Sequence, residues 1–147
     1  GVELARVAVE DGTIGHGEIR VGDTVVLAFD RRPEWPSMPS LLRVFVPDAD
    51  AAMAGAVEAG ARVVTEAATN AWGARGGRVR DPLGNIWWVT AQLETVSAED
   101  SWARLSEPGY AAAMREAQET LDVELTGLPT GRASAPVAPT QPGPDQP

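Results

Sequence analysis

The stretch WGARGGRVRDPLGNIWWVT, residues Trp72–Thr90, carries the clearest fold signal of the sequence. It contains a glycine-rich loop, a short basic strand, a DPLGN turn and a second strand with two adjacent tryptophans. Proline presets φ at the second turn position and glycine tolerates a positive φ, which is typical of a tight turn between two strands. Because successive side chains on a strand point to opposite faces, Trp87 and Trp88 are expected on opposite faces of the sheet.

The same alternation predicts which side chains meet across the turn. Trp88 shares a face with Ile86 and Thr90, while Arg78 and Arg80 share one face of the preceding strand. A hairpin then brings both arginines and one tryptophan together, and a guanidinium over an indole contributes roughly 0.5–2 kcal/mol. Two interpretations stay open: a solvated face with a half-covered tryptophan, or the wall of a pocket for a planar or anionic small molecule.

Over residues 1–92 the predicted elements are short strands, with one helix between them. Strands are predicted over residues 2–10, 16–22, 24–29, 41–46, 62–67, 76–80 and 86–91. The helix begins at the N-cap Asp48 and ends before Gly60. The second half is therefore β-α-β-β-β, and the first half is the same unit without its leading strand and helix. Together with the missing initial Met, this predicts further residues upstream of Gly1.

Two helices and a tail are predicted after the last strand. A capping box at Ser97 begins a short helix with Trp102 and Leu105 inward, and a longer helix carries an apolar stripe from Tyr110 to Leu125. The last residues are rich in Pro, Ala, Thr and Gly and are predicted to be disordered. The expected organisation is a partial first module at 1–30, a connector at 31–40, a second module at 41–93, C-terminal helices at 94–126 and a tail at 127–147.

Composition excludes several classes of partner and chemistry. The net charge of −9 argues against binding to nucleic acids or anionic membranes. No apolar run approaches the ~20 residues of a membrane span. The absence of cysteine excludes disulfides and thiolate catalysis, and it fits a cytoplasmic location.

His16 and Glu18 are the candidates for acid–base chemistry. His16 is the only histidine of the chain, and Glu18 shares its face of the predicted strand. A metal site normally needs three or four such ligands, so this pair alone predicts no metal. Either side chain could instead act as a general base.

Three segments resemble the glyoxalase / bleomycin-resistance / extradiol-dioxygenase superfamily (vicinal oxygen chelate fold), most closely its PhnB-like branch. They are GHGEIRVGDTVVLAFD (Gly15–Asp30), LLRVFVPDADAAMAGAVEAGARVV (Leu41–Val64) and the stretch Trp72–Thr90. The resemblance covers about residues 1–92. It implies an α+β fold of two βαβββ modules whose curved sheets surround a concave site, with the first module lacking its leading strand and helix.

The resemblance also implies where metal-dependent members hold their ligands. A glutamate seven residues after the turn aspartate corresponds to Trp88 here, and a histidine on the first strand of the second module corresponds to Leu41. These replacements predict that no metal or cofactor is bound, that Trp88 faces the concave site, and that Trp87 packs under the helices. The expected ligand-binding residues are Glu18, Phe29, Arg43, Trp72, Arg75 and Trp88.

Three functions follow from these expectations. The first is a metal-free protein that binds, and sequesters, a planar or charged metabolite or antibiotic. The alternative is a lyase, isomerase or dioxygenase-type enzyme of the same superfamily, with Glu18 or His16 as general base. The third is a protein-interaction role for the C-terminal helix. The resemblance predicts a homodimer as the oligomeric state.

Overall fold

The computed structural model of the protein describes residues 1–127, so the predicted tail lies, from residue 128 on, outside the described residues. The chain divides into two compact units, Gly1–Met38 and a second unit that begins at Pro39. The elements of the described part are β1 (Val2–Ala8), β2 (Ile14–Val21), β3 (Thr24–Ala28), β4 (Leu41–Phe45), α1 (Ala49–Glu58), β5 (Arg62–Thr69), β6 (Ala74–Arg80), β7 (Ile86–Gln92), α2 (Ala98–Leu105) and α3 (Pro108–Thr126).

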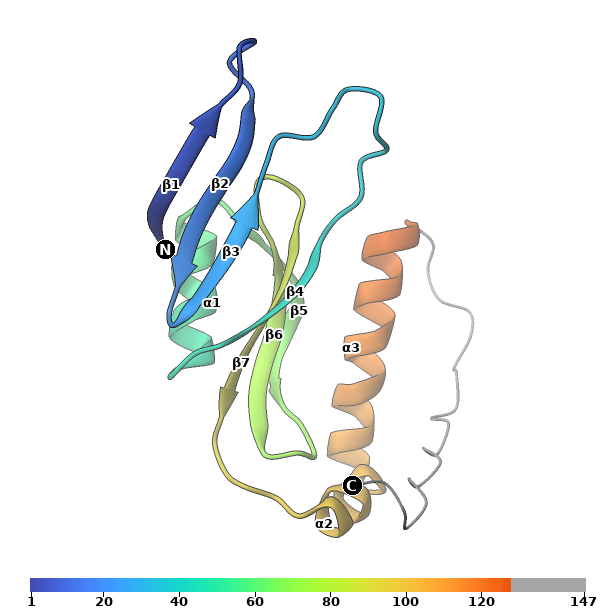
Figure 1. Ribbon diagram of the computed structural model, residues 1–147. Helices are drawn as coiled ribbons and strands as arrows, with labels where there is room; N and C mark the ends of the chain where they lie inside the picture. Colours follow the sequence, from blue (N-terminus) through green and yellow to red (C-terminus); the bar gives the residue numbers. More distant parts are fainter. Residues whose placement is uncertain (128–147) are drawn as a thin grey trace, which may run out of the picture. The chain divides into compact units, whose positions relative to one another are not determined.

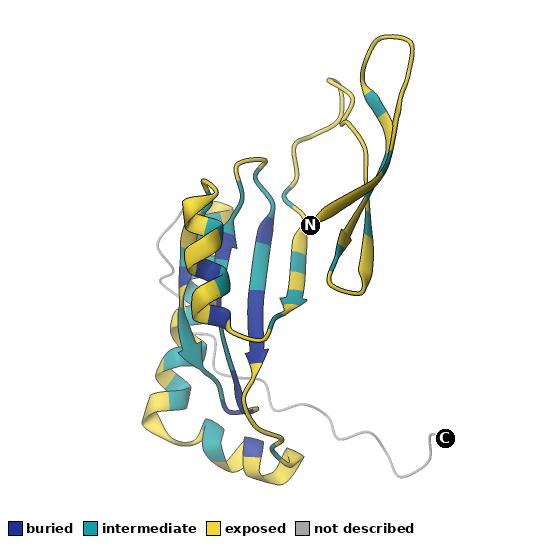
Figure 2. Cartoon of the chain, turned by 90° about the vertical axis from the view of Figure 1, so that its left-hand side faces the viewer, coloured by how far each residue is buried: buried dark blue, intermediate teal, exposed yellow. Residues whose placement is uncertain are grey.

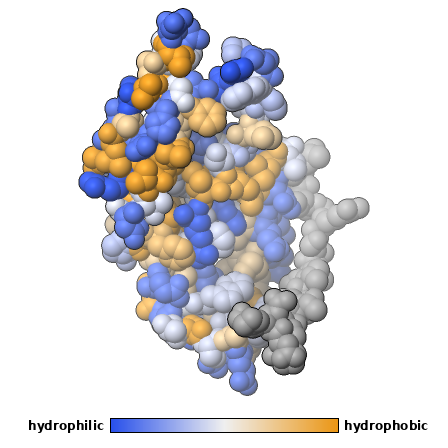
Figure 3. All heavy atoms as spheres, viewed as in Figure 1, coloured by the Kyte–Doolittle hydropathy of each residue, from blue (hydrophilic) through white to orange (hydrophobic). Residues whose placement is uncertain are grey.

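The first unit is a three-stranded antiparallel sheet with the strand order β1-β2-β3. A two-residue turn at Gly22 and Asp23 joins β2 to β3, as the sequence predicts. None of residues 1–38 is buried, and the sheet is coloured as exposed over most of its length in Figure 2. Apolar side chains such as Leu27 and Phe29 are exposed, and apolar atoms gather over these strands in Figure 3. The unit therefore has no buried core of its own.

The second unit is the predicted β-α-β-β-β arrangement. Its strands have the order β4-β7-β6-β5; β4 runs parallel to β7, and the other neighbours are antiparallel. The short DPLGN turn makes β6 and β7 antiparallel neighbours, whereas the chain passes through α1 between β4 and β5, which lie at opposite edges (Figure 1). The protein thus has an α+β fold with one antiparallel and one mixed sheet, and the α+β class is as expected.

Helix α1 has the ends that the sequence predicts and covers one face of the second sheet. The Asp48 carboxylate accepts a hydrogen bond from the backbone N–H of Ala51, and Gly60 follows the C-cap with a φ of 97°. The core of the unit consists of Ala49 and Met53 from this helix packed on Val79, Val89 and Ala91 of the sheet.

Helix α2 begins at the predicted capping residue but buries a different side. Ser97 Oγ accepts a hydrogen bond from the backbone N–H of Asp100 at 3.0 Å. The buried residue of the helix is Ser101, whose Oγ donates to the carbonyl oxygen of Ser97, while Trp102 is 46% exposed. The prediction that Trp102 lies inward is therefore wrong, because the next position on a helix points about 100° away from the buried one.

Candidate functional site

A row of three side chains crosses the second sheet on the face opposite α1. Strand register places Arg43 of β4 and Arg78 of β6 directly beside Trp88 of β7. The guanidinium carbons of Arg43 and Arg78 lie 4.5 and 5.0 Å from the centroid of the Trp88 ring. Arg43 also stacks on Phe45 at 4.6 Å, and its Nε donates to Thr90 Oγ1 at 3.3 Å. Each strand therefore contributes one member of a cation–aromatic row, which we call the Arg–Trp–Arg row.

Trp87 takes the other face, as strand alternation requires. Its ring packs against the core under α1, and its indole N–H donates to Asp81 Oδ2 at 2.9 Å. The two adjacent tryptophans thus have separate surroundings. Trp87 belongs to the core and the turn, while Trp88 belongs to the face that carries the two arginines.

Helix α3 covers part of the face that carries the Arg–Trp–Arg row, so α1 and α3 lie on opposite sides of the second sheet (Figure 1). The contacts between α3 and the sheet are largely polar. Thr65 Oγ1 and Thr120 Oγ1 share a hydrogen bond of 2.6 Å, and Arg78 Nη1 donates to the carbonyl oxygen of Ala117 at 2.5 Å. Glu124 accepts from both Arg62 and Arg80.

The apolar stripe predicted for α3 is only partly covered by the sheet. Tyr110, Met114, Ala117 and Leu121 are half-buried, and Leu125 is exposed. No residue of the helix is fully buried. Polar contacts therefore contribute a large share of what holds α3 in place, which makes its position sensitive to charge.

The ion pairs at Glu124 lead to a prediction about α3. Its carboxylate is 9% exposed, and the hydrogen bond from Arg62, with a second from Arg80, lowers the pKa of Glu124 below its usual value against the opposing effect of desolvation. We expect Glu124→Gln to weaken the docking of α3 on the sheet by about 1–2 kcal/mol. Hydrogen exchange of the α3 amides measures this effect, and Glu116→Gln, on an exposed position of the same helix, is the control.

The sign of the pH dependence follows from the lowered pKa of Glu124. The contribution is fully present above the unfolded value of about 4.3 and is lost as the pH falls through the folded value. Wild type and Glu124→Gln should therefore converge in acid. Equal protection of α3 in both proteins at pH 7 would contradict the prediction.

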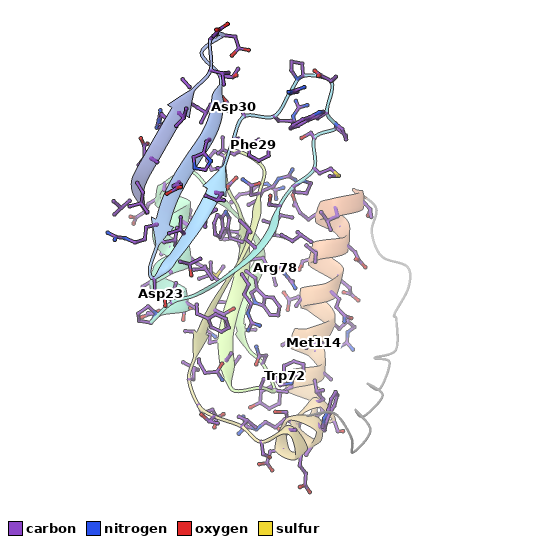
Figure 4. The ribbon with its side chains drawn as sticks, in the orientation of Figure 1. Asp23, Phe29, Asp30, Trp72, Arg78 and Met114 are labelled. Atoms are coloured by element: carbon purple, nitrogen blue, oxygen red, sulfur yellow. The ribbon has the colours of Figure 1, made fainter. Side chains whose placement is uncertain are left out.

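A small cavity lies between α3 and the sheet, next to the Arg–Trp–Arg row. Its volume is about 70 Å³, and its lining includes Trp72, Arg78, Trp88 and Met114. Figure 4 shows Trp72 and Arg78 on the side of the sheet that carries Met114 of α3. Arg78 is half-buried, and this burial lowers its pKa, but the guanidinium is basic enough to stay protonated at neutral pH.

The structure brings only some of the sequence-predicted residues to this face. Arg43, Trp72 and Trp88 lie there. Arg75 does not: its register partner is Ala91, on the α1 face, and its guanidinium makes two hydrogen bonds of 2.6 and 2.7 Å with Asp50 of that helix. Trp88 pairs with Arg78, and Arg75 lies three residues before Arg78 on the same strand. An odd separation along a strand puts two side chains on opposite faces, so Arg75 does not share the face of Trp88 as expected.

The other candidates belong to the first unit. His16 Nε2 and Glu18 Oε1 are 3.0 Å apart, so the predicted pair on one strand face is formed. Phe29 is 63% exposed, and its ring meets that of Trp35 edge-on at 6.2 Å.

Arg78 and Met114 line the cavity and are absent from the predicted list. Arg78 could have been included, because its alternation with Trp88 is visible in the sequence. Met114 could not, because its position depends on where α3 docks.

The face that carries Trp88 does not fit a divalent cation. Its chemistry at this point is an indole flanked by two guanidiniums, which would repel a metal ion. Across residues 1–127, no three His, Asp or Glu side chains come together as a ligand set. Over the same residues, no helix is both long and apolar enough to span a membrane.

Comparison with known proteins identifies the family. The model of the Glyoxalase/Bleomycin resistance protein/Dioxygenase superfamily matches residues 1–89. The uncharacterized proteins Mb0911c of Mycobacterium bovis and Rv0887c of Mycobacterium tuberculosis are each 33% identical over 119 residues. These matches cover 74% of this chain and 78% and 70% of those proteins.

Two solved structures are similar as well. The crystal structure of TioX from Micromonospora sp. ML1 has a TM-score of 0.50 at 27% identity, over 63% of this chain and 79% of that chain. Protein PA1353 from Pseudomonas aeruginosa has a TM-score of 0.47 at 22% identity, over 56% and 66%. From the family match over more than half of its length, the chain belongs to the glyoxalase / bleomycin resistance protein / dioxygenase superfamily.

Proposed function

We propose that this protein binds a small organic molecule on the α3-covered face of its second sheet, without a metal and without chemistry. The observation that carries the proposal is Trp88, flanked by Arg43 and Arg78 and bordering a cavity. Aromatic walls with a few convergent charges suit a planar or charged metabolite or antibiotic. Sequestration of such a compound needs only binding.

The cavity is too small for a typical ligand unless α3 moves. A volume of about 70 Å³ is well below the roughly 300–1,000 Å³ of typical ligand pockets. A larger ligand therefore requires α3 to move outward. Because a ligand shifts an equilibrium toward the state that it binds better, loosening α3 with Glu124→Gln should raise the affinity.

A thermal-shift screen of neutral, cationic and anionic compounds tests the proposed function. A ligand at one hundred times its Kd stabilises the folded protein by about 2.7 kcal/mol, which raises Tm by several degrees. We expect Trp88→Ala to weaken the binding of such a ligand about tenfold and Trp88→Phe to weaken it less. Addition of EDTA should leave the binding unchanged. Trp102→Ala changes an exposed tryptophan on α2 and serves as the control. A screen without any hit, or a hit indifferent to Trp88→Ala, would contradict the proposal.

The enzyme alternative is supported by a different observation, the hydrogen-bonded pair of His16 and Glu18. A carboxylate held beside an imidazole can act as the general base of a lyase, isomerase or dioxygenase-type reaction. Mass spectrometry of each hit after incubation separates the two functions. An unchanged compound supports binding alone, whereas a conversion that Glu18→Gln abolishes supports the enzyme.

The proposed oligomeric state is a homodimer. Exposed apolar side chains of the first unit, among them Val25, Leu27 and Phe29, support a homodimer, because open strand edges and apolar faces favour association. A role for Glu18 and Phe29 in ligand binding, membership of the PhnB-like branch and a cytoplasmic location are proposed on the sequence alone.

A further inference from the structure

We propose that the Arg–Trp–Arg row binds the carboxylate of a small organic acid with an apolar body. This inference rests on the proposed function and names the chemical class of its ligand.

Within residues 1–127, the two arginines of the row form no ion pair with a carboxylate. Four other arginines of the second unit have them: Arg62 and Arg80 pair with Glu124, Arg75 with Asp50, and Arg104 with Glu94. Among the described residues, neither Arg43 nor Arg78 has an acidic side chain within 4.0 Å. The cavity lining beside Arg78 also includes Glu66 and Glu116, but neither glutamate forms an ion pair with the row. Two adjacent cations without such a pair favour an anion from outside.

The guanidinium groups keep donors for such an anion. A guanidinium has five N–H donors. Arg43 uses only Nε, toward Thr90, and Arg78 uses only Nη1, toward Thr65 and Ala117, within the part of the chain that the structure describes. Because both groups stack on one indole, their positions relative to each other are restricted before a ligand arrives, which lowers the entropic cost of binding.

Arg78 gains the most from an anionic ligand. Its guanidinium is half-buried on the side covered by α3, and it donates to the Thr65 hydroxyl and the Ala117 backbone carbonyl, which carry no net charge. The lowering of its pKa by burial is consistent with a cation that lacks compensation. A carboxylate would form the stronger charge-assisted hydrogen bonds, and its planar geometry matches the guanidinium fork.

The surroundings of the row favour an apolar body over a free inorganic anion. On the same face of β4, Leu41 and Phe45 flank Arg43 and are 60% and 63% exposed. On the other side of the row, Trp72 and Met114 line the cavity (Figure 4). An anionic head group between apolar surfaces corresponds to an aryl or alkyl carboxylate.

A matched pair of probes tests the inference on the full chain. 2-Naphthoate and its neutral counterpart 2-naphthamide share one ring system and differ in charge. We expect calorimetry to give naphthoate at least tenfold tighter binding, with affinity falling as salt rises. Arg43→Gln and Arg78→Gln should each reduce naphthoate affinity about tenfold and leave naphthamide binding nearly unchanged, with Arg43→Lys intermediate. Arg75→Gln, on the opposite face of β6, is the matched control.

The outcomes separate this inference from the proposed function. Equal affinity for both probes, or the same loss in Arg75→Gln as in Arg43→Gln, overturns the carboxylate assignment and leaves small-molecule binding intact. Failure of both probes, when the screen still finds a ligand that depends on Trp88, overturns it as well. If neither the probes nor any compound of the screen binds, both proposals fall. Since Arg43 is exposed, its variants report on binding even if Arg78→Gln impairs folding.

Discussion

Gly76→Ala is expected to lower the free energy of unfolding by about 3 kcal/mol, because β6 and β7 leave no room for a methyl group there. A Cβ on Gly76 would lie 2.3 Å from the carbonyl oxygen of Val89 and 3.2 Å from the Cα of Thr90. Both atoms belong to the backbone of the neighbouring strand, which cannot move aside without disturbing the β6–β7 pairing. Urea unfolding followed by tryptophan fluorescence measures the loss.

Gly55→Ala provides the matched control for this substitution. Gly55 lies in α1, and a Cβ there would meet no atom within 4 Å. Because glycine weakens a helix interior, we expect this variant to gain roughly 0.5–1 kcal/mol. If Gly76→Ala were as stable as wild type, the close approach of the two strands would be refuted.

Asp81→Ala is expected to lower the free energy of unfolding by about 2–4 kcal/mol, because one carboxylate organises the whole DPLGN turn. Asp81 Oδ1 accepts from the backbone N–H groups of Leu83 and Asn85, both at 2.9 Å. Its Oδ2 accepts from the Asn85 side chain at 3.1 Å and from the Trp87 indole at 2.9 Å. The variant leaves these donors without their acceptor, including that of a half-buried tryptophan.

The difference between wild type and Asp81→Ala should depend on pH. Desolvation raises the pKa of Asp81, but the hydrogen bonds from Trp87, Asn85 and Leu83 outweigh it, so the folded pKa lies below its usual value of about 3.9. The stabilisation is present above that usual value and is lost as the pH falls through the folded pKa. The difference in urea midpoint between wild type and Asp81→Ala should therefore be smaller at pH 3 than at pH 7. Asp81→Asn, which keeps one oxygen, should lose less than Asp81→Ala; an equal loss would show that charge alone matters.

Much of the second unit could be predicted from the sequence because its signals are local. Asp48 caps α1, the residues 81–85 form the turn, and alternation separates Trp87 from Trp88, each through residues a few positions apart. The prediction for Trp102 was wrong because a local signal was too weak there. A helix of eight residues has too few turns for its apolar pattern to indicate which face is buried.

Within the candidate site, too, local features could be predicted from the sequence and long-range contacts could not. The sequence by itself determined the βαβββ order and the meeting of Arg78 with Trp88, because turn chemistry and the two-residue period of a strand are local properties. Only the tertiary structure decided that Arg75 pairs with Asp50 and that α3 covers the Trp88 face. The α3 contacts join residues 39 to 62 positions apart. No pattern along the chain specifies such contacts, because they depend on how complete elements pack in space.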